Sequence, residues 1–319
     1  MTLPTLLDIA KRNGSDSVVG LIEEVIPAFP EISGMHAIPG KGMVSIPSVG
    51  ASRTIKGRMY KTLVRTALPT VGFRDANQGV AASKSTYENR MVETFILNPR
   101  WECDVAIADQ SEDGPQAFIA DEAVAMTRAS FIALAKQFYY GRNTGGDAKG
   151  HPGLIDSVDS SMVVDAEGTT AGTGSSVWAV KYGPQFVQWV YGEEGSLDMT
   201  DPRIESIEDD NGNRFSAYIQ ELLAYPGLQV ASKHAIARIK DLTADSGKSL
   251  DDDKLANLVQ KFPAGIVPDV LFMSRRSLSQ LRNSRTATNV TGAPAPYPTD
   301  WEGIPIAVTD SILDTETLT

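Results

Sequence analysis

The hydrophobic positions of residues 115–140 predict one long helix that is packed on several sides. The stretch has no glycine and no internal proline, and it is rich in alanine, the residue with the highest helix propensity. Gly114 and Pro115 suit an N-cap and a first helical position, and Gly141 suits the end of the helix. The apolar side chains spread around the cylinder instead of forming one stripe: Phe118, Ile119, Ala123, Met126, Ile132, Ala133 and Tyr140.

Residues 55–71 and 87–97 have the alternation of β-strands rather than a helical period. In the first of them one face carries Met59, Lys61, Leu63 and Arg65, so neither face is wholly apolar and the strand is expected to be exposed on both sides. A polar loop separates the two runs, which together predict a long β-hairpin. An isolated hairpin is only marginally stable in water, so we expect this one to dock on a neighbouring subunit.

The N-terminal region has the pattern of an extended arm. Residues 3–12 predict a short amphipathic helix, residues 17–26 predict a second, and frequent proline and glycine then exclude long regular structure up to residue 50. Such a segment cannot bury its own apolar side chains and is expected to lie on another part of the structure.

The C-terminal half alternates between strands and helices. Two strands are expected within residues 176–191, with a break at Gly183 and Pro184, and a hairpin within residues 204–223. A helix over residues 250–261 could be capped by Ser249, and a second helix could begin after Ser274. Strands are also expected at residues 270–273 and 304–308. This mixture is typical of an α+β fold.

Charge is distributed unevenly along the chain. The net charge is −11 and the pI is near 4.8, which argues against binding of nucleic acid through overall charge. Residues 51–90 carry eight basic and two acidic residues, a net charge of +6, so the remainder carries −17. This basic segment could bind nucleic acid or the acidic surface of another copy of the chain, and the alternative is a solvated polar loop. Its basic residues are Arg53, Lys56, Arg58, Lys61, Arg65, Arg74, Lys84 and Arg90.

Length and composition exclude several classes of protein. The chain has 319 residues, of which 42% are hydrophobic, enough for one large or two interleaved domains with real cores. No apolar run is long enough to cross a membrane, and the N-terminus lacks the features of a signal peptide. Cys103 is the single cysteine, so no disulfide can form within the chain.

No catalytic, cofactor-binding or metal-binding constellation is visible. The three histidines lack the spacing of a zinc site. Gly247-Lys248-Ser249 resembles the end of a phosphate-binding loop, but Leu242 stands where the motif needs its first glycine. Asp209, Asn211 and Gly212 resemble part of a calcium loop whose first and last ligands are missing, and a hairpin turn explains them better. We therefore expect neither an enzyme nor a cofactor, although this glycine–lysine pair leaves a nucleotide-binding enzyme as a weak alternative.

Five segments, taken in order, resemble the major capsid proteins of tailed bacteriophages. They are FYYGRNTGGDAKGHPGLIDSV after the long helix, SSVWAVKYGPQFVQWVYGEEGSL, IESIEDDNGNRFSAYIQELLAYPGLQVASKHAIARI, DVLFMSRRSLSQLRNSR and PTDWEGIPIAVTDSIL. The resemblance covers residues 91–319 by sequence and the preceding part by its arm-and-hairpin pattern.

The resemblance implies the Hong Kong 97 capsid fold, with four parts. Residues 1–48 would be the N-terminal arm, 49–95 the E-loop hairpin, 96–150 with 294–319 the peripheral domain, and 151–293 the axial domain. Residues 115–140 would be the spine helix of the peripheral domain, and at least one of Phe118, Met126, Phe131 and Tyr139 should touch the arm or another chain. The E-loop would lie on an adjacent subunit and contact it through Arg53, Lys56, Arg58, Lys61, Arg65, Arg74 and Lys84.

The function implied is structural. Copies of the chain would assemble into pentamers and hexamers that form the icosahedral head shell around the double-stranded DNA of a phage. Because the chain begins at the arm, scaffolding would be a separate protein or a removed segment, and portal and decoration proteins would be further partners. The protein would be assembled in the cytoplasm of the host bacterium and reside in the virion, without contact to a membrane. An encapsulin shell around a cargo enzyme is the alternative with the same fold.

Overall fold

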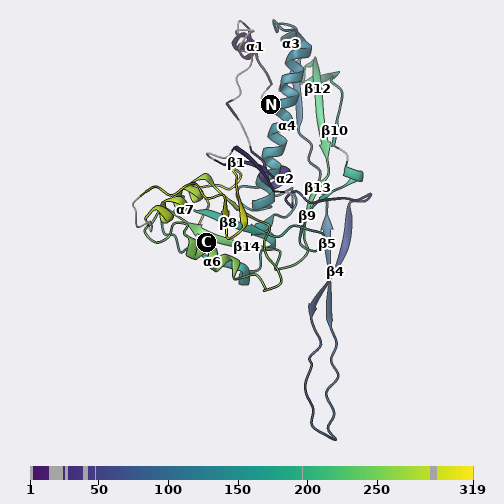
Figure 1. Ribbon diagram of the computed structural model, residues 1–319. Coiled ribbons are helices and arrows are strands. Elements are labelled where there is room, and N and C mark those ends of the chain that lie inside the picture. Colours follow the sequence, from purple (N-terminus) through teal and green to yellow (C-terminus); the bar gives the residue numbers. More distant parts are fainter. Residues whose placement is uncertain are drawn as a thin grey trace.

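The long predicted helix forms the axis around which the chain is arranged. A computed structural model describes residues 3–13, 24–25, 28–38, 42–46, 48–195, 197–287 and 293–318. α4 (Pro115–Tyr140) runs down the upper part of the molecule into the main core, and a β-hairpin projects from the opposite end (Figure 1). The helix expected at residues 17–26 lies outside the described residues, except for 24 and 25.

The ends of α4 are those predicted from its flanking residues. Gly114 is the N-cap with φ +84°, Pro115 follows it, and Gly141 ends the helix with φ +54°. A Cβ atom on Gly141 would lie 2.0 Å from Oδ2 of Asp156 and 2.1 Å from the backbone nitrogen of Gly153. Glycine is therefore required there both by the positive φ and by the close approach of the following loop.

A six-stranded sheet forms the larger body and is covered by helices. Its order is β16 (Asp300–Trp301), β17 (Ile304–Val308), β15 (Val270–Met273), β8 (Ser175–Val180), β14 (Ile236–Leu242) and β7 (Val163–Asp165). Side chains of α6 (Asp252–Val259) and α7 (Arg275–Ala287) form one apolar core with the sheet, and the C-terminal end of α4 belongs to the other core. Short helices α5 (Leu154–Ser157) and η1 (Ser160–Met162) lead into this body.

The two helices of this body differ in how well their starts were predicted. Ser274 accepts a hydrogen bond from the backbone nitrogen of Ser277 at 3.2 Å, which confirms it as the cap of α7. The predicted Ser249 cap of α6 is wrong: Asp251 accepts from the backbone nitrogen of Lys254 at 2.8 Å, and the helix begins at Asp252. Serine and aspartate are both suitable helix caps. Leu250 is buried before the helix, which begins two residues after the predicted start.

A second sheet lies along the upper part of α4. Its long strand β12 (Arg214–Ala224) pairs with β11 (Arg203–Glu208), β10 (Leu197–Met199) and β6 (Arg100–Asp104), and a short helix α3 (Val105–Ala108) follows β6 (Figure 1). The turn between β11 and β12 confirms the predicted hairpin, because Asp209 accepts hydrogen bonds from the backbone nitrogens of Asn211 and Asn213, each at 2.8 Å. The calcium-like residues thus make a turn.

Three small sheets complete the structure. β13 (Pro226–Val230), β9 (Val187–Tyr191) and β3 (Ser52–Thr54) form one, with η2 (Glu193–Gly195) after β9. β1 (Met35–Ile38) pairs with β2 (Gly42–Ser45), and β4 (Met59–Ala67) pairs with β5 (Thr86–Glu93) in the projecting hairpin. The break predicted at Gly183 and Pro184 therefore separates strands of two different sheets, since β8 belongs to the large sheet.

Strand pairing does not follow the domain boundaries expected from the resemblance. β17 pairs in parallel with β15 in the six-stranded sheet, although residues 294–319 were expected in the domain of the long helix. Conversely, β12 pairs with β10, β11 and β6 beside α4, although residues 197–224 were expected in the other domain. Such pairings join segments far apart in sequence, and no local pattern encodes them.

The N-terminal arm runs along α4 and contacts it at three levels. Near the start of α4, Ile9 of α1 (Leu6–Arg12) packs with Phe118. Farther along, the ring of Phe29, just before α2 (Pro30–Ser33), lies 5.7 Å from that of Phe131. Near the end, Ile46 and Val49 share the main core with Tyr139. The prediction that the apolar side chains of this helix face different surroundings, including the arm, is confirmed, and the helix can be called a spine.

Arg12 connects the arm to the start of the spine helix. It pairs with Asp121 and, at 3.5 Å, with Glu122, and its guanidinium lies 4.8 Å from the ring centre of Phe118. We expect Arg12→Ala to weaken docking of α1 by about 1–2 kcal/mol, because two partly screened ion pairs and one cation–π contact are lost together. Hydrogen exchange of peptides from residues 3–13 measures this effect.

Lys11→Ala is the matched control for Arg12→Ala. Lys11 is exposed and pairs only with the equally exposed Asp8 at 3.7 Å, among the described residues. Its removal should leave exchange of residues 3–13 nearly unchanged, since such pairs contribute about 0–1 kcal/mol. Equal acceleration of exchange by both substitutions would contradict the role of Arg12.

Candidate inter-subunit interface

The projecting hairpin is attached firmly at its root. On the face toward the body, the Tyr60 hydroxyl donates to Oε1 of Gln229, and Nη1 of Arg90 donates to the carbonyl oxygen of Ala231 at 3.1 Å. The backbone nitrogen of Thr94 donates to the carbonyl of Arg58 at 2.9 Å. The Tyr60 and Arg90 contacts hold β4 and β5 to the strand β13 and the residue after it, whereas the Thr94 contact joins the two sides of the hairpin.

The opposite face of the hairpin has no partner within the described chain. Antiparallel pairing places Lys61 opposite Met91 and Arg65 opposite Tyr87, so these side chains share one face. We call this the outer face; its members are Met59, Lys61, Leu63, Arg65, Tyr87, Asn89, Met91 and Glu93. All are exposed, Leu63 by 68%. An exposed strand face of mixed apolar and basic side chains is typical of a surface that binds another protein.

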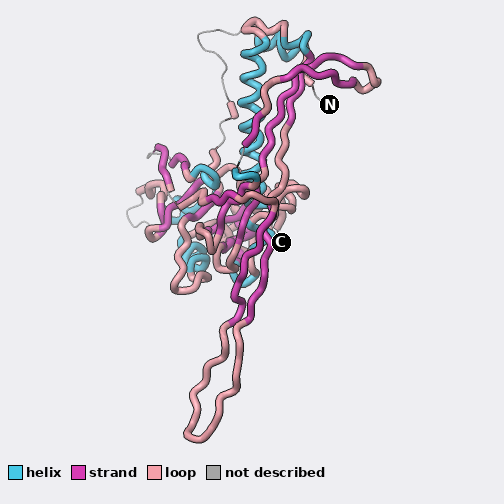
Figure 2. The backbone as a smooth tube through the Cα atoms, turned by 90° about the vertical axis from the view of Figure 1, so that its right-hand side faces the viewer, coloured by secondary structure: helices cyan, strands magenta, loops and turns pink. Residues whose placement is uncertain are grey.

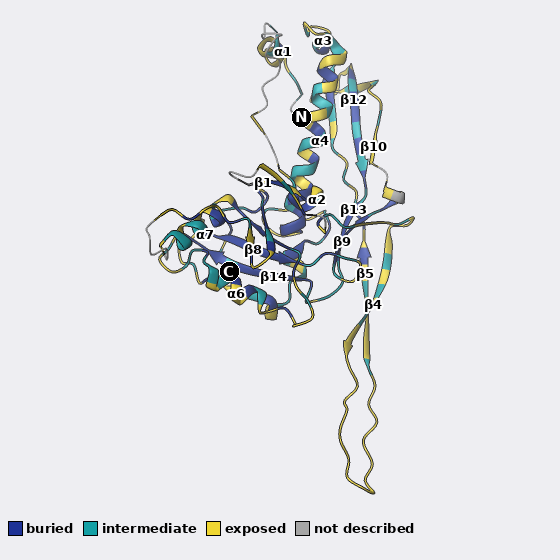
Figure 3. Cartoon of the chain, viewed as in Figure 1, coloured by how far each residue is buried: buried dark blue, intermediate teal, exposed yellow. Residues whose placement is uncertain are grey.

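The tip of the hairpin, residues 68–85, extends away from the rest of the molecule (Figure 2). It has no paired strands; Ser83 donates to the carbonyl of Thr70 at 3.0 Å, and Arg74 donates to that of Gln78 at 2.8 Å. Its apolar side chains Val71 and Phe73 are almost fully exposed, and nearly the whole tip is exposed in Figure 3. Sequence reasoning missed these apolar residues, although apolar side chains in a loop without a core were a usable signal.

The seven predicted contact residues all lie on the exposed hairpin or the segment leading to it. The Arg53 guanidinium lies 4.5 Å from the ring centre of Tyr60, and that of Arg65 lies 5.4 Å from the ring centre of Tyr87. Lys56 and Arg58 line a cleft with Glu193 at the root. Within the described part of the chain, six of the seven form no ion pair: Arg53, Arg58, Lys61, Arg65, Arg74 and Lys84.

These cations also influence the hairpin tyrosines. Burial raises the pKa of Tyr60, and the nearby Arg53 opposes that rise. Hydrogen bonds from Ser85 and Arg65 lower the pKa of the exposed Tyr87. Arg53 and Arg65 thus lie against aromatic rings of the hairpin.

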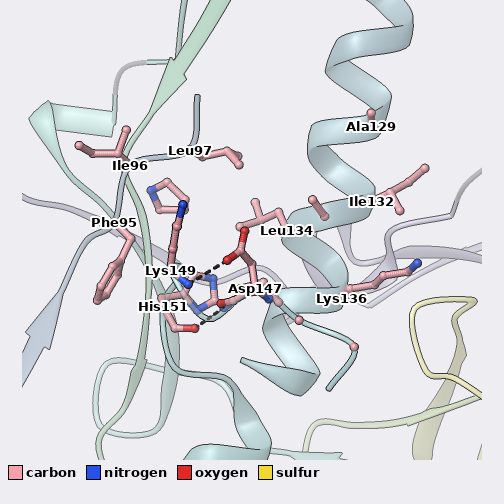
Figure 4. Close-up of a pocket in the computed structure, with 16 residues that line it drawn as sticks. Phe95, Ile96, Leu97, Ala129, Ile132, Leu134, Lys136, Asp147, Lys149 and His151 are labelled. Carbon is pink, nitrogen blue, oxygen red and sulfur yellow. Dashed lines mark hydrogen bonds between the residues drawn. The ribbon is translucent and has the colours of Figure 1, made fainter. Parts of the chain in front are cut away.

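A cavity of about 450 Å³ lies where the root of the hairpin meets the spine helix. Figure 4 shows Phe95, Ile96 and Leu97 on one side of it, and Ile132 and Leu134 of the spine helix on the other. The glycine-rich loop after the helix forms a third wall. It is held by a hydrogen bond from Nε2 of the spine residue Gln137 to the carbonyl of the loop's His151 at 2.6 Å.

The glycine-rich loop brings a buried histidine, His151, to this cavity. Burial lowers the pKa of His151 to about 4, so its ring is neutral. No group of three or more His, Cys, Asp or Glu residues could hold a metal ion, and no helix is long and apolar enough to span a bilayer, in the described ranges. The Nζ atom of Lys248, which sequence analysis compared with a phosphate-binding lysine, pairs with Glu167 at 2.6 Å.

Comparison with protein families gives a match to the family described as major capsid protein GP7, over residues 51–319. The chain belongs to this family. As a major capsid protein, it has a structural role in the shell of a phage head, and copies of the chain build that shell. No curated protein sequence matches the chain.

Solved structures agree with the family in fold. The structure of bacteriophage Epsilon15 matches with a TM-score of 0.68 at 19% identity, covering 100% of this chain and 98% of that one. The bacteriophage JBD30 capsid gives a TM-score of 0.49 at 10% identity, with 98% and 95% covered. An encapsulin complex from Synechococcus elongatus gives 0.40 at 11%, with 76% and 97% covered. The major capsid protein therefore has the expected α+β fold of the Hong Kong 97 type.

Proposed function

We propose that the hairpin β4–β5 is the E-loop of this capsid protein and that it lies on an adjacent subunit of the shell. The observation that carries the proposal is its outer face, which exposes Met59, Leu63, Tyr87 and Met91 beside cations that have no ion pair in the described chain. Exposed apolar side chains supply the buried area of such a contact, and the cations select an acidic partner. With a charge of −17 outside residues 51–90, a second copy offers that acidity.

In the assembled particle, such contacts would connect subunits into pentamers and hexamers of an icosahedral head that encloses double-stranded DNA. The acidic chain supports this role, because an inner wall with little net attraction for phosphate does not hinder packing of the genome. Its partners would include a scaffolding protein, a portal and decoration proteins, and assembly would take place in the host cytoplasm. The chain would act by assembly rather than by catalysis.

Strand pairing supports a division of the chain that differs from the one expected from sequence. The peripheral domain would comprise α4, β6 and β10–β12, and the axial domain the six-stranded sheet with α6 and α7. In this division residues 197–224 join the peripheral domain and β17 joins the axial domain. The arm would cover the spine helix of the peripheral domain.

Reversing the charge of the outer face should weaken assembly while leaving the subunit folded. In Lys61→Glu/Arg65→Glu, two cations without intrachain ion pairs become anions facing an acidic partner. Exposed pairs contribute about 0–1 kcal/mol each, so the subunit concentration needed for assembly should rise at least about tenfold. Sedimentation and electron microscopy of the purified protein over a concentration series measure this.

The control is Lys61→Arg/Arg65→Lys, which keeps both charges and should assemble like the unchanged protein. Salt should reduce the difference between the two variants, because the Debye length falls to about 3 Å at 1 M ionic strength. Normal assembly of the charge-reversed variant would refute the proposed contact. Particles that contain a cargo enzyme instead of DNA would contradict the phage head.

A further inference from the structure

Glu31 is a fully buried carboxyl group in the N-terminal arm. It lies in α2 and is 0% exposed. Its Oε1 accepts a hydrogen bond from the Ser311 hydroxyl at 2.8 Å. The Thr309 hydroxyl also lowers the pKa of the carboxyl group through hydrogen bonding. Its Oε2 has no hydrogen-bond partner among the described residues. An ionised carboxylate with one unsatisfied oxygen is costly to bury.

Among the described residues, Glu31 forms no ion pair with a cation. The hydroxyls of Tyr139 on the spine helix and Tyr182 after β8 are both buried and have no partner in the described chain, and both are affected electrostatically by Glu31. The nearest charged group, Asp310, is itself an anion, and it pairs with the exposed Arg275 at 2.7 Å. Hydrogen bonds to the carboxyl group offset its burial only in part, so burial raises the pKa of Glu31 to about 7.

Docking of the arm is what buries this group. The carbonyl oxygen of Glu31 accepts a hydrogen bond from Nε1 of Trp189 at 3.0 Å, and Ile32, Ile46 and Val49 pack into the main core. If residues 28–50 left the body, the carboxyl group would return to water with an ordinary pKa near 4.5. Docking and protonation are thus thermodynamically linked.

We propose that Glu31 makes docking of the N-terminal arm proton-dependent, so that the docked arm holds a proton that the released arm gives up. This goes beyond the shell-forming role, since it concerns a switch within each subunit. A proton on Oε2 converts the unpartnered acceptor into a hydrogen-bond donor. The same proton removes a charge from the apolar core.

The sign and size of the pH effect on docking follow from the pKa of Glu31 in the docked arm, about 7, and in the released arm, near 4.5. The contribution of Glu31 to docking is fully present below pH 4.5 and is lost as the pH rises to about 7. From well below pH 4.5 to well above pH 7 the docking equilibrium should fall by about 300-fold in total. His36 on β1 is the other buried titratable group of the arm; burial lowers its pKa, so acid opposes docking through His36 below pH 6.5.

The experiment compares wild type with Glu31→Gln, which keeps the shape and removes the titration. Hydrogen exchange of peptides from residues 28–50 is measured in the full-length protein between pH 5.5 and 7.5, with correction for intrinsic exchange rates. Because His36 is present in both proteins, the ratio of their exchange rates isolates Glu31. We expect this ratio, wild type over variant, to rise about 15-fold between pH 5.5 and 7 and to approach a plateau above pH 7.5.

Two further measurements keep the test decisive. Ser311→Ala removes a hydrogen bond that stabilises the ionised carboxylate, so this variant, which retains Glu31, should shift the transition to higher pH. If Glu31→Gln does not fold, isotope-edited infrared spectra of wild type should show a protonated glutamic acid at pH 6 that disappears by pH 8. A ratio that is independent of pH, or a carboxyl group ionised at pH 6, would overturn the proposal.

Discussion

Replacing Glu316 with alanine should lower the free energy of unfolding by about 3–5 kcal/mol, because it leaves a buried arginine without its counter-charge. The Oε2 atom of Glu316 lies 3.0 Å from Nη2 of Arg238, and both side chains are almost completely buried. Its Oε1 accepts from Tyr140 at 2.6 Å and from Ser176 at 2.8 Å. The network thus joins the C-terminal segment to the end of the spine helix.

Urea unfolding of the unassembled subunit measures this loss, which should appear as a lower midpoint at an unchanged slope. Glu208→Ala is the control, since Glu208 also pairs with an arginine, Arg214, at 2.8 Å, but both side chains are mostly exposed. We expect it to cost no more than about 1 kcal/mol. Similar losses in the two variants would show that burial of the Glu316 pair is unimportant.

Phe138→Ala should destabilise the subunit by a similar amount, about 3–5 kcal/mol, through the cavity it creates. The side chain is 0% exposed at the centre of the main core. Its ring centre lies 5.2 Å from that of Trp189 in a stacked arrangement, and 5.0 Å from that of Tyr139. Strands of the six-stranded sheet and of the sheet β13–β9–β3 meet the spine helix near this ring, so little can move to fill the space. Thermal or urea unfolding of the isolated subunit measures the change.

Phe73→Ala removes the same side chain from the tip of the hairpin, where it is fully exposed. Subunit stability should change by no more than about 0.5 kcal/mol, as is usual for surface substitutions. Assembly should instead require a higher protein concentration, if the tip packs on a neighbour. Loss of subunit stability in Phe73→Ala would contradict the exposed position of the tip.

The spine helix and the hairpin could be predicted from sequence because their signals are local. Gly114, Pro115 and Gly141 define the ends of α4, and alternation along residues 59–67 defines a strand of the hairpin. The basic side chains of the proposed interface were also found by counting charges. All these features depend on residues close together in the chain.

The features that were missed depend on contacts between distant segments. The pairing of β17 with β15 and the attachment of Arg12 to Asp121 leave no periodic pattern in either partner. Glu31 looks like an ordinary acidic residue at the start of a short helix, and only the surrounding core shows that its carboxyl group is buried.

The contrast between the root and the tip of the hairpin has a mechanical consequence. In a closed shell built from one kind of chain, neighbouring subunits cannot all meet at the same angle. Tyr60 and Arg90 fix the direction in which the hairpin leaves its own subunit, whereas residues 68–85 have few internal bonds to lose when they bend. Differences in curvature would then be absorbed at the far end of the hairpin, leaving the rest of each subunit unstrained. One sequence could thereby serve every position in the shell.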